Sequence, residues 1–179
     1  LFFSFLQKSK GIWTALHAML AVIAQNPNVH FTFAGPAESE QFVVEMKDFV
    51  KTNNLERNFE YVGYVGDEEK RTEYFRKSDI FIFPTLRDVF GLVLLHAMAE
   101  RLAIIASVEG AVPEIVVDGQ TGFLFPKGDD AALAAKILLL AQDPALRSRM
   151  GANGRAKYER SYTLEAYAQR MIGVFKSLS

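Results

Sequence analysis

Short apolar segments alternate with helical segments along nearly the whole sequence, and this alternation constrains the fold more than any other feature. Six segments rich in Phe, Val and Ile have the length and composition of buried strands: 2–6, 29–34, 59–62, 79–84, 102–107 and 122–125. Segments predicted to be helical lie between them: 11–25, 39–53, 67–77, 90–100 and 113–117. The segment 67–77 is charged and is capped by Asp67. Strands that alternate with helices predict βαβ units, and therefore a parallel sheet with helices on both faces.

The C-terminal part of the sequence, from about 129 to 178, predicts only helices. We expect them over 129–141, 144–160 and 163–178, with Asp129 and Thr163 as N-caps. No internal repeat or linker divides the sequence. We therefore expect one α/β domain over residues 1–179, a three-layer sandwich with about six parallel strands.

Charge and missing residue types exclude several classes of protein. The 20 Lys and Arg residues balance 21 Asp and Glu residues, so no basic excess indicates nucleic-acid binding. The absence of cysteine excludes disulfides, thiolate metal sites and cysteine nucleophiles. The sequence also lacks G-x-G-x-x-G after the first strand, G-x-x-x-x-G-K-[ST], G-x-S-x-G and H-E-x-x-H. These absences argue against a nicotinamide dehydrogenase, a P-loop NTPase, an α/β-hydrolase and a zincin.

An uncharged segment near the start predicts a buried helix and not a transmembrane one. Its apolar centre, residues 12–24, would span roughly 20 Å as a helix, which is less than the ~30 Å hydrocarbon core. Thr14 and His17 interrupt it. Lys8 and Lys10 follow the first apolar segment instead of preceding it, which argues against a signal peptide. Because the sequence opens on Leu1 without Met, we expect a fragment cut at a domain boundary.

Ligands of open α/β sheets bind at the carboxyl ends of the strands, so the loops there are the candidate site. They span residues 4–11, 35–36, 63–67, 85–91 and 107–113. A helix that begins near Phe90 would leave its first N–H groups free, and Gly91 would let an anion approach the backbone. The helix start is therefore either a diphosphate site or an ordinary helix terminus with a glycine for packing.

Three further positions each allow a functional and a structural interpretation. Asp88 and His96 would lie about 12 Å apart on a common helix, and could contact the two ends of an extended ligand. They could equally be a helix N-terminal charge and a satisfied, half-buried histidine. Glu114 could accept hydrogen bonds from sugar hydroxyls or simply occupy a first helical turn. Lys8 and Lys10 could bind a diphosphate or be solvated.

Taken in order, these segments resemble the C-terminal domain of the family-four glycosyltransferases, also called glycosyl transferases group 1. The residues that carry the resemblance are 10–11, 33–35, 59–65, 78–85, 88–99, 110–116 and 118–125. The family is built from two facing Rossmann-like domains, the GT-B architecture. The resemblance implies that this chain is the Rossmann-like half that binds a nucleotide-sugar donor, in polysaccharide or glycoconjugate biosynthesis.

The resemblance also implies a role for each site residue. Gly63, Tyr64 and Val65 would contact the base, and Lys10 with Phe90, Gly91, Leu92 and Val93 would contact the diphosphate. Asp88 and His96 fall on the two glutamates of the family motif, the first for the donor sugar and the second for the ribose, and Glu114 would contact the substrate. Sugar transfer would retain the anomeric configuration. No metal or other cofactor would be required, because positive protein groups stabilise the departing diphosphate.

The sequence departs from the family pattern at four places. Phe5 replaces an arginine, and Asp88 is one methylene shorter than glutamate. His96 offers one acceptor where a carboxylate offers two oxygens. Residues 100–103, which include Arg101, lack the usual Gly and Pro. These changes motivate an alternative: a non-catalytic binding or assembly module with a degenerate donor site. A generic doubly wound domain of the receiver type is a third option, against which the missing acidic cluster argues.

The resemblance implies one further partner. An N-terminal acceptor-binding domain of the same enzyme would lie outside this chain, and we expect the chain alone to transfer no sugar. We expect a cytoplasmic protein without a transmembrane segment. Any peripheral contact of the full-length protein with the inner membrane would be made by the acceptor half.

Overall fold

The computed structural model describes residues 1–177, and within them six strands alternate with helices as the sequence predicts. The strands are β1 (Phe2–Phe3), β2 (Phe31–Ala34), β3 (Phe59–Gly63), β4 (Ile80–Phe83), β5 (Ala103–Ser107) and β6 (Gly122–Phe125). The helices between them are η1 (Lys8–Lys10), α1 (Ile12–Gln25), α2 (Glu40–Thr52), η2 (Glu56–Asn58), α3 (Glu68–Arg76), α4 (Leu92–Ala99) and α5 (Val112–Ile115). The C-terminal helices are α6 (Asp130–Gln142), α7 (Pro144–Ser161) and α8 (Leu164–Ser177). Leu178, included in the predicted last helix, lies outside the described residues.

The strands form two three-stranded parallel sheets, β1-β2-β3 and β4-β5-β6, and not the single predicted sheet of about six. The two sheets meet at β1 and β4. There the Leu1 amino group donates to the Ile80 carbonyl at 2.8 Å, and the Ile82 N–H donates to the Leu1 carbonyl at 2.9 Å. Since β1 has only two residues, its pairing with β4 does not extend into a ladder. The spatial order β3-β2-β1-β4-β5-β6 is that of a doubly wound fold, and strand order reverses between β1 and β4.

The core consists of two apolar clusters, one on each face of the strands. In β4 and β5, Ile82 and Ile105 belong to the cluster that contains residues of α1, α2 and α6. Their neighbours Phe81 and Ile104 belong to the cluster that contains residues of α3, α4 and α5. This alternation follows from the period of two along a strand. It confirms the predicted sandwich of a strand layer between two helical layers.

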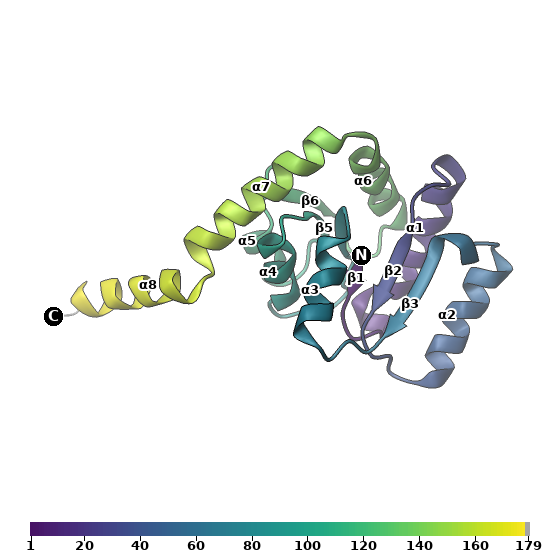
Figure 1. Cartoon of the computed structure of the whole chain (residues 1–179), viewed down its shortest axis with the longest axis horizontal. Helices are drawn as coiled ribbons and strands as arrows, with labels where there is room; N and C mark the ends of the chain where they lie inside the picture. The colour runs from purple at the N-terminus through teal and green to yellow at the C-terminus, as the bar shows by residue number, and fades with distance from the viewer. Residues whose placement is uncertain (178–179) are drawn as a thin grey trace.

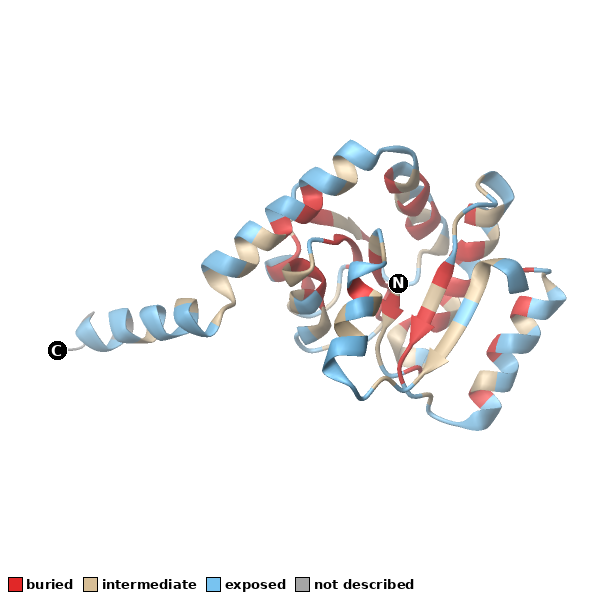
Figure 2. Ribbon diagram, viewed as in Figure 1, coloured by how far each residue is buried: buried red, intermediate tan, exposed pale blue. Residues whose placement is uncertain are grey.

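The last helix leaves this compact body. Figure 1 shows α8 extending away from the rest of the molecule, and Figure 2 shows that most of its residues are exposed. The predicted N-caps are confirmed: Asp129 accepts a hydrogen bond from the Ala132 N–H at 2.8 Å, and Thr163 accepts one from the Ala166 N–H at 3.1 Å. Among residues 1–177 no helix is both long and apolar enough to cross a membrane.

Candidate functional site

A pocket of about 320 Å³ opens at the carboxyl ends of β1, β2 and β3, beside helix α4. This is the edge at which the reversal of strand order predicts a ligand site. The lining residues come from the loops that follow the three strands and from one face each of α3 and α4. They are Phe3, Ser4, Phe5, Gly35, Pro36, Tyr64, Val65, Gly66, Arg71, Phe75, Leu92, Val93 and His96. We call it the switch-point pocket.

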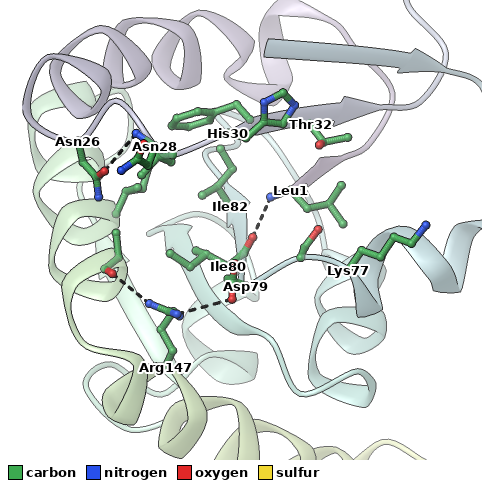
Figure 3. Close-up of a pocket in the computed structure, with 15 residues that line it drawn as sticks. Leu1, Asn26, Asn28, His30, Thr32, Lys77, Asp79, Ile80, Ile82 and Arg147 are labelled. Atoms are coloured by element: carbon green, nitrogen blue, oxygen red, sulfur yellow. Dashed lines mark hydrogen bonds and ion pairs between the residues drawn. The ribbon is translucent and has the colours of Figure 1, made fainter. Parts of the chain in front are cut away.

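A slightly larger cavity, about 370 Å³, lies at the opposite edge, where the strands begin (Figure 3). Two of its charged groups are bound within the protein. The Arg147 guanidinium donates to the Leu140 carbonyl at 2.5 Å and lies 3.6 Å from the Asp79 carboxylate. The nitrogen of Leu1 donates to the Ile80 carbonyl at 2.8 Å. Open α/β sheets bind their ligands at the carboxyl ends of the strands, so the switch-point pocket is the better candidate.

Two loops beside the switch-point pocket are joined by backbone hydrogen bonds. The Ser9 carbonyl accepts from the Leu86 N–H at 2.9 Å and from the Arg87 N–H at 3.1 Å. Gly11 fits against the second loop only because it has no side chain: a Cβ would lie 1.8 Å from the Pro84 carbonyl oxygen, and its φ is +72°. The loop that carries Lys10 is therefore held firmly against residues 84–88.

This junction brings Lys10 and Asp88 together. The Lys10 ammonium donates to Asp88 Oδ2 at 2.5 Å, and the two side chains are 19% and 15% exposed. Asp88 Oδ1 accepts from the N–H groups of Phe90 at 3.2 Å and Gly91 at 2.9 Å. One carboxylate therefore binds the lysine and two of the amides that the sequence suggested for a diphosphate.

The Asp88 contacts also move the start of the helix. The sequence predicted a helix over 90–100, but α4 begins at Leu92, with Gly91 as an N-cap at φ +76°. Asp88 therefore precedes the helix and does not lie on it with His96, although residues 92–95, the greater part of the segment between the two, are helical as expected. The N–H groups of Leu92 and Val93 lie in the first turn, where helix geometry supplies no acceptor.

His96 faces the switch-point pocket from α4 and is exposed. Its ring centroid lies 6.1 Å from that of Phe75, and neither ring nitrogen has a hydrogen-bond partner among residues 1–177. His96 is therefore partly buried, as the structural interpretation expected, but its ring nitrogens are not satisfied within residues 1–177. Partial burial lowers the pKa of His96, the nearby Arg71 guanidinium lowers it further, and Glu68 and Glu100 oppose this less strongly. The imidazole is consequently neutral at pH 7.

Arg71 is a charged pocket residue that the sequence pattern did not predict. It lies on α3, within the charged segment 67–73, where no motif distinguishes it from its neighbours. Its guanidinium lies 3.9 Å from the Glu68 carboxylate, whose side chain is 86% exposed. Only the packing of α3 against α4 turns Arg71 toward the pocket, so no sequence pattern could have identified it.

The predicted site residues fall into three groups. Tyr64, Val65, Leu92, Val93 and His96 line the switch-point pocket, whereas Lys10, Asp88, Phe90 and Gly91 form the adjoining junction. Gly63 and Glu114 belong to neither group. The Gly63 carbonyl accepts from the Gly35 N–H at 2.8 Å. Glu114 lies exposed on the four-residue helix α5, which follows a turn in which the Ala111 N–H donates to the Val89 carbonyl at 3.3 Å.

Comparison with known proteins identifies the family. Residues 1–157 match the model of the family Glycosyl transferases group 1. The chain belongs to this family, and its fold is that of the C-terminal domain of a GT-B glycosyltransferase. The resemblance seen in the sequence motifs is thereby confirmed.

Individual relatives agree with this assignment. The capsular polysaccharide biosynthesis glycosyltransferase CapM of Staphylococcus aureus is 30% identical over 171 residues, which are 95% of this chain and 43% of CapM. This chain spans about half the length, or less, of the curated relatives it matches.

Solved structures match the whole fold. The C-terminal domain of a glycosyl transferase group 1 family protein (LpcC) from Francisella tularensis superposes with a TM-score of 0.85 at 27% identity, covering 91% of this chain and 85% of that domain. Anabaena Alr3699/HepE, crystallised in complex with UDP, has a TM-score of 0.88 at 22% identity and covers 98% of this chain and 48% of HepE. At that identity the likeness to HepE concerns the fold.

Proposed function

We propose that this chain is the donor-binding half of a retaining glycosyltransferase, which moves a sugar from a nucleotide-diphosphate sugar to an acceptor. The observation that carries the proposal is the switch-point pocket, which lies where open α/β sheets bind nucleotides. Membership of the glycosyl transferases group 1 supports it. The UDP and UDP-glucose complexes of HepE support a nucleotide sugar as the ligand class.

The nucleoside would lie against the loop after β3, close to Gly63 and beside the exposed Tyr64 and Val65, which line the pocket. The diphosphate would accept hydrogen bonds from the N–H groups of Leu92 and Val93 at the positive end of α4. Asp88 would then contact the donor sugar.

Binding of a diphosphate would change the junction beside the pocket. The Lys10 ammonium is shared with Asp88, so the diphosphate would have to compete with that carboxylate for it. Charge stabilisation of the leaving diphosphate by protein cations and helix amides would make a metal ion unnecessary. Glu114, exposed on α5, would meet the substrate only from outside the pocket.

The acceptor would bind to a domain that is not part of this sequence. If the acceptor binds to that domain, the isolated chain should transfer no sugar to any acceptor. We place the enzyme in the cytoplasm, with any peripheral contact with the inner membrane made by the other half.

A second candidate is a non-catalytic binding or assembly module. One observation favours it: Asp88 binds Lys10 and the Phe90 and Gly91 amides within the protein, so these groups are already satisfied without a ligand. Phe5 at the pocket and His96 in place of a carboxylate point in the same direction.

Titration of the purified chain with UDP, GDP, ADP and their sugar conjugates separates the two candidates. A donor site predicts selective binding of one nucleotide. Ligand at 100 times its Kd should add about 2.7 kcal/mol of stability, which raises Tm by a few degrees. Calorimetry and thermal shift measure this. The absence of binding by a chain whose circular dichroism shows it to be folded would contradict a functional donor site and favour the module.

A further inference from the structure

The ionisable side chains that line the switch-point pocket, apart from the Tyr64 phenol, are a guanidinium and an imidazole. Arg71 comes from α3 and His96 from α4, and among the described residues no carboxylate lines this pocket. The family position now held by His96 would normally supply a carboxylate, an acceptor suited to ribose hydroxyls. The pocket therefore offers donors where a carboxylate would offer acceptors.

Arg71 is available to a ligand in a way that Lys10 is not. The Arg71 guanidinium lies 3.9 Å from the Glu68 carboxylate, whose side chain is 86% exposed. Solvent screens such a surface ion pair, so it contributes little free energy. The five N–H donors of a guanidinium form a planar fork that suits phosphate oxygens. Lys10, in contrast, is bound at 2.5 Å by a carboxylate that is mostly buried.

The His96 imidazole is also available to a ligand. Neither ring nitrogen has a hydrogen-bond partner within residues 1–177. A neutral imidazole has one N–H donor, and protonation gives it two. The side chain therefore can donate to an oxygen atom placed between α3 and α4, and can gain a proton when that oxygen is negatively charged.

We propose that Arg71 and His96 together bind a phosphoryl group of the ligand in the switch-point pocket. The inference rests on the proposed nucleotide-sugar function and specifies which end of the pocket takes the charge. The guanidinium N–H groups and the imidazole N–H donate to the phosphoryl oxygens, which only accept. The phosphoryl group is either part of the diphosphate or a phosphate ester on the ribose, and both have the same chemistry.

The pair also makes ligand binding depend on pH. Arg71 and Glu68 on α3, Glu100 on α4 and the Tyr64 hydroxyl are the groups that face or influence His96, and Arg76 is hydrogen-bonded to Glu100. A bound phosphoryl group opposes the effect of Arg71 and raises the pKa of His96. Binding therefore takes up protons, and affinity rises as the pH falls through the pKa of the bound state.

Calorimetry with matched variants tests the pair. Arg71→Gln should weaken binding of the best nucleoside diphosphate of the panel by about tenfold or more, as expected for one charge-assisted hydrogen bond. Lys70→Gln is the control, since it removes the same charge from the neighbouring, exposed position outside the pocket and should change affinity less than about twofold. His96→Asn should abolish the rise in affinity between pH 7.5 and 5.5. Circular dichroism and Tm check that each variant folds.

His96→Glu gives opposite results under the two possible occupants. A carboxylate there would pair with Arg71 and repel a phosphoryl group, so we expect weaker binding of the nucleoside diphosphate. If the position holds a ribose diol instead, the same change should strengthen binding. A gain in affinity, or equal affinities for Arg71→Gln and Lys70→Gln, would overturn the inference.

The choice of ligands shows whether the phosphoryl group belongs to the diphosphate or to the ribose. It also tests the Arg71–His96 pair separately from the nucleotide-sugar function. If it belongs to the diphosphate, the nucleoside diphosphate and inorganic pyrophosphate should lose affinity in Arg71→Gln and the free nucleoside should not. If it lies on the ribose, only the nucleoside 3′-monophosphate should lose affinity. Pyrophosphate binding that needs Arg71, without any nucleotide preference, would support the pair and contradict the nucleotide-sugar function. Selective nucleotide binding that Arg71→Gln leaves unchanged would support the nucleotide-sugar function and contradict the pair.

Discussion

Lys10 and Arg71 are two cations at the same edge of the strands, and they differ in what surrounds them. Lys10 lies in a loop fastened to a second loop, where Asp88 binds it at 2.5 Å. Arg71 projects from a helix into the switch-point pocket, with one exposed carboxylate at 3.9 Å. The comparison teaches that a cation at the expected place in a motif is not necessarily available for a ligand. Availability depends on the partners that the fold supplies.

The surroundings of Lys10 and Arg71 also differ in rigidity. The largest expected effect is the loss of stability when the junction that holds Lys10 is disrupted. Gly11→Ala would put a Cβ 1.8 Å from the Pro84 carbonyl oxygen at a φ of +72°. We expect it to lower the free energy of unfolding by about 2 kcal/mol or more beyond the cost of the positive φ. Chemical denaturation measures the change.

Gly119→Ala is the matched control for that variant. Gly119 has a φ of +71° and no atom within 4 Å of an added Cβ, so only the left-handed backbone is penalised, at about 1–2 kcal/mol. Equal destabilisation of the two variants would mean that the contact between the loops is not tight, and the contrast in rigidity would fail.

Asp88→Asn should make the Lys10 ammonium available to a ligand, as the Arg71 guanidinium already is. The amide oxygen still accepts from the Phe90 and Gly91 N–H groups, but the negative charge that holds Lys10 is gone. UDP lacks the donor sugar, so its affinity reports on the nucleoside and the diphosphate without the sugar that Asp88 would contact. We expect about three- to tenfold tighter UDP binding by calorimetry, since the ligand gains a charge-assisted hydrogen bond that Asp88 now takes. Unchanged or weaker binding would indicate that Lys10 does not reach the diphosphate.

Lys10→Ala should have a smaller effect on ligand binding than Arg71→Gln. Because a ligand must first displace Asp88, Lys10 contributes less than the 1.5–3 kcal/mol typical of a hydrogen bond to a charged group. We expect about a threefold loss of UDP affinity. A loss of affinity larger than that of Arg71→Gln would mean that Lys10 contributes more to ligand binding than Arg71, which would contradict the comparison.

The smallest expected effect is the pH dependence of stability due to His96. Its pKa is lower in the folded chain than the unfolded value of about 6.5, so the unfolded state binds more protons at mildly acidic pH. Stability contributed by the neutral imidazole is therefore present above the unfolded pKa and is lost as the pH falls toward the folded pKa. His96→Asn should flatten the dependence of Tm on pH between 7 and 5, and an unchanged dependence would contradict the shift.

Most of the fold could be predicted from the sequence, because hydrophobic periodicity reports directly on burial. Each predicted strand and helix is present, with ends displaced by a few residues. The prediction of a single sheet was the exception. Strand β1 contains two residues, and the preceding residue, Leu1, makes the hydrogen bonds to Ile80 and Ile82 of β4. Sequence pattern does not reveal such short pairings.

The site was less predictable, for reasons of side-chain chemistry. Tyr64 and Val65 follow from the rule that ligands bind at strand ends, and they do line the pocket. His96 follows from its spacing from Asp88 and from the family resemblance, and it lines the pocket too. The helix near Phe90 starts two residues later than predicted because the Asp88 carboxylate accepts from the preceding amides. Arg71 could not be found, since its role depends on the packing of α3 against α4 and not on a local pattern.

The most direct test of the account is an amide NMR titration of the isotopically labelled chain with UDP, GDP and ADP. We expect one nucleotide to shift the resonances of Val65, Arg71 and Val93, which line the switch-point pocket, and to leave those of Asn28 and His30 in the opposite cavity unchanged. Shifts confined to Asn28 and His30, or no shifts in a folded chain at millimolar nucleotide, would contradict the assignment of the switch-point pocket as the donor site.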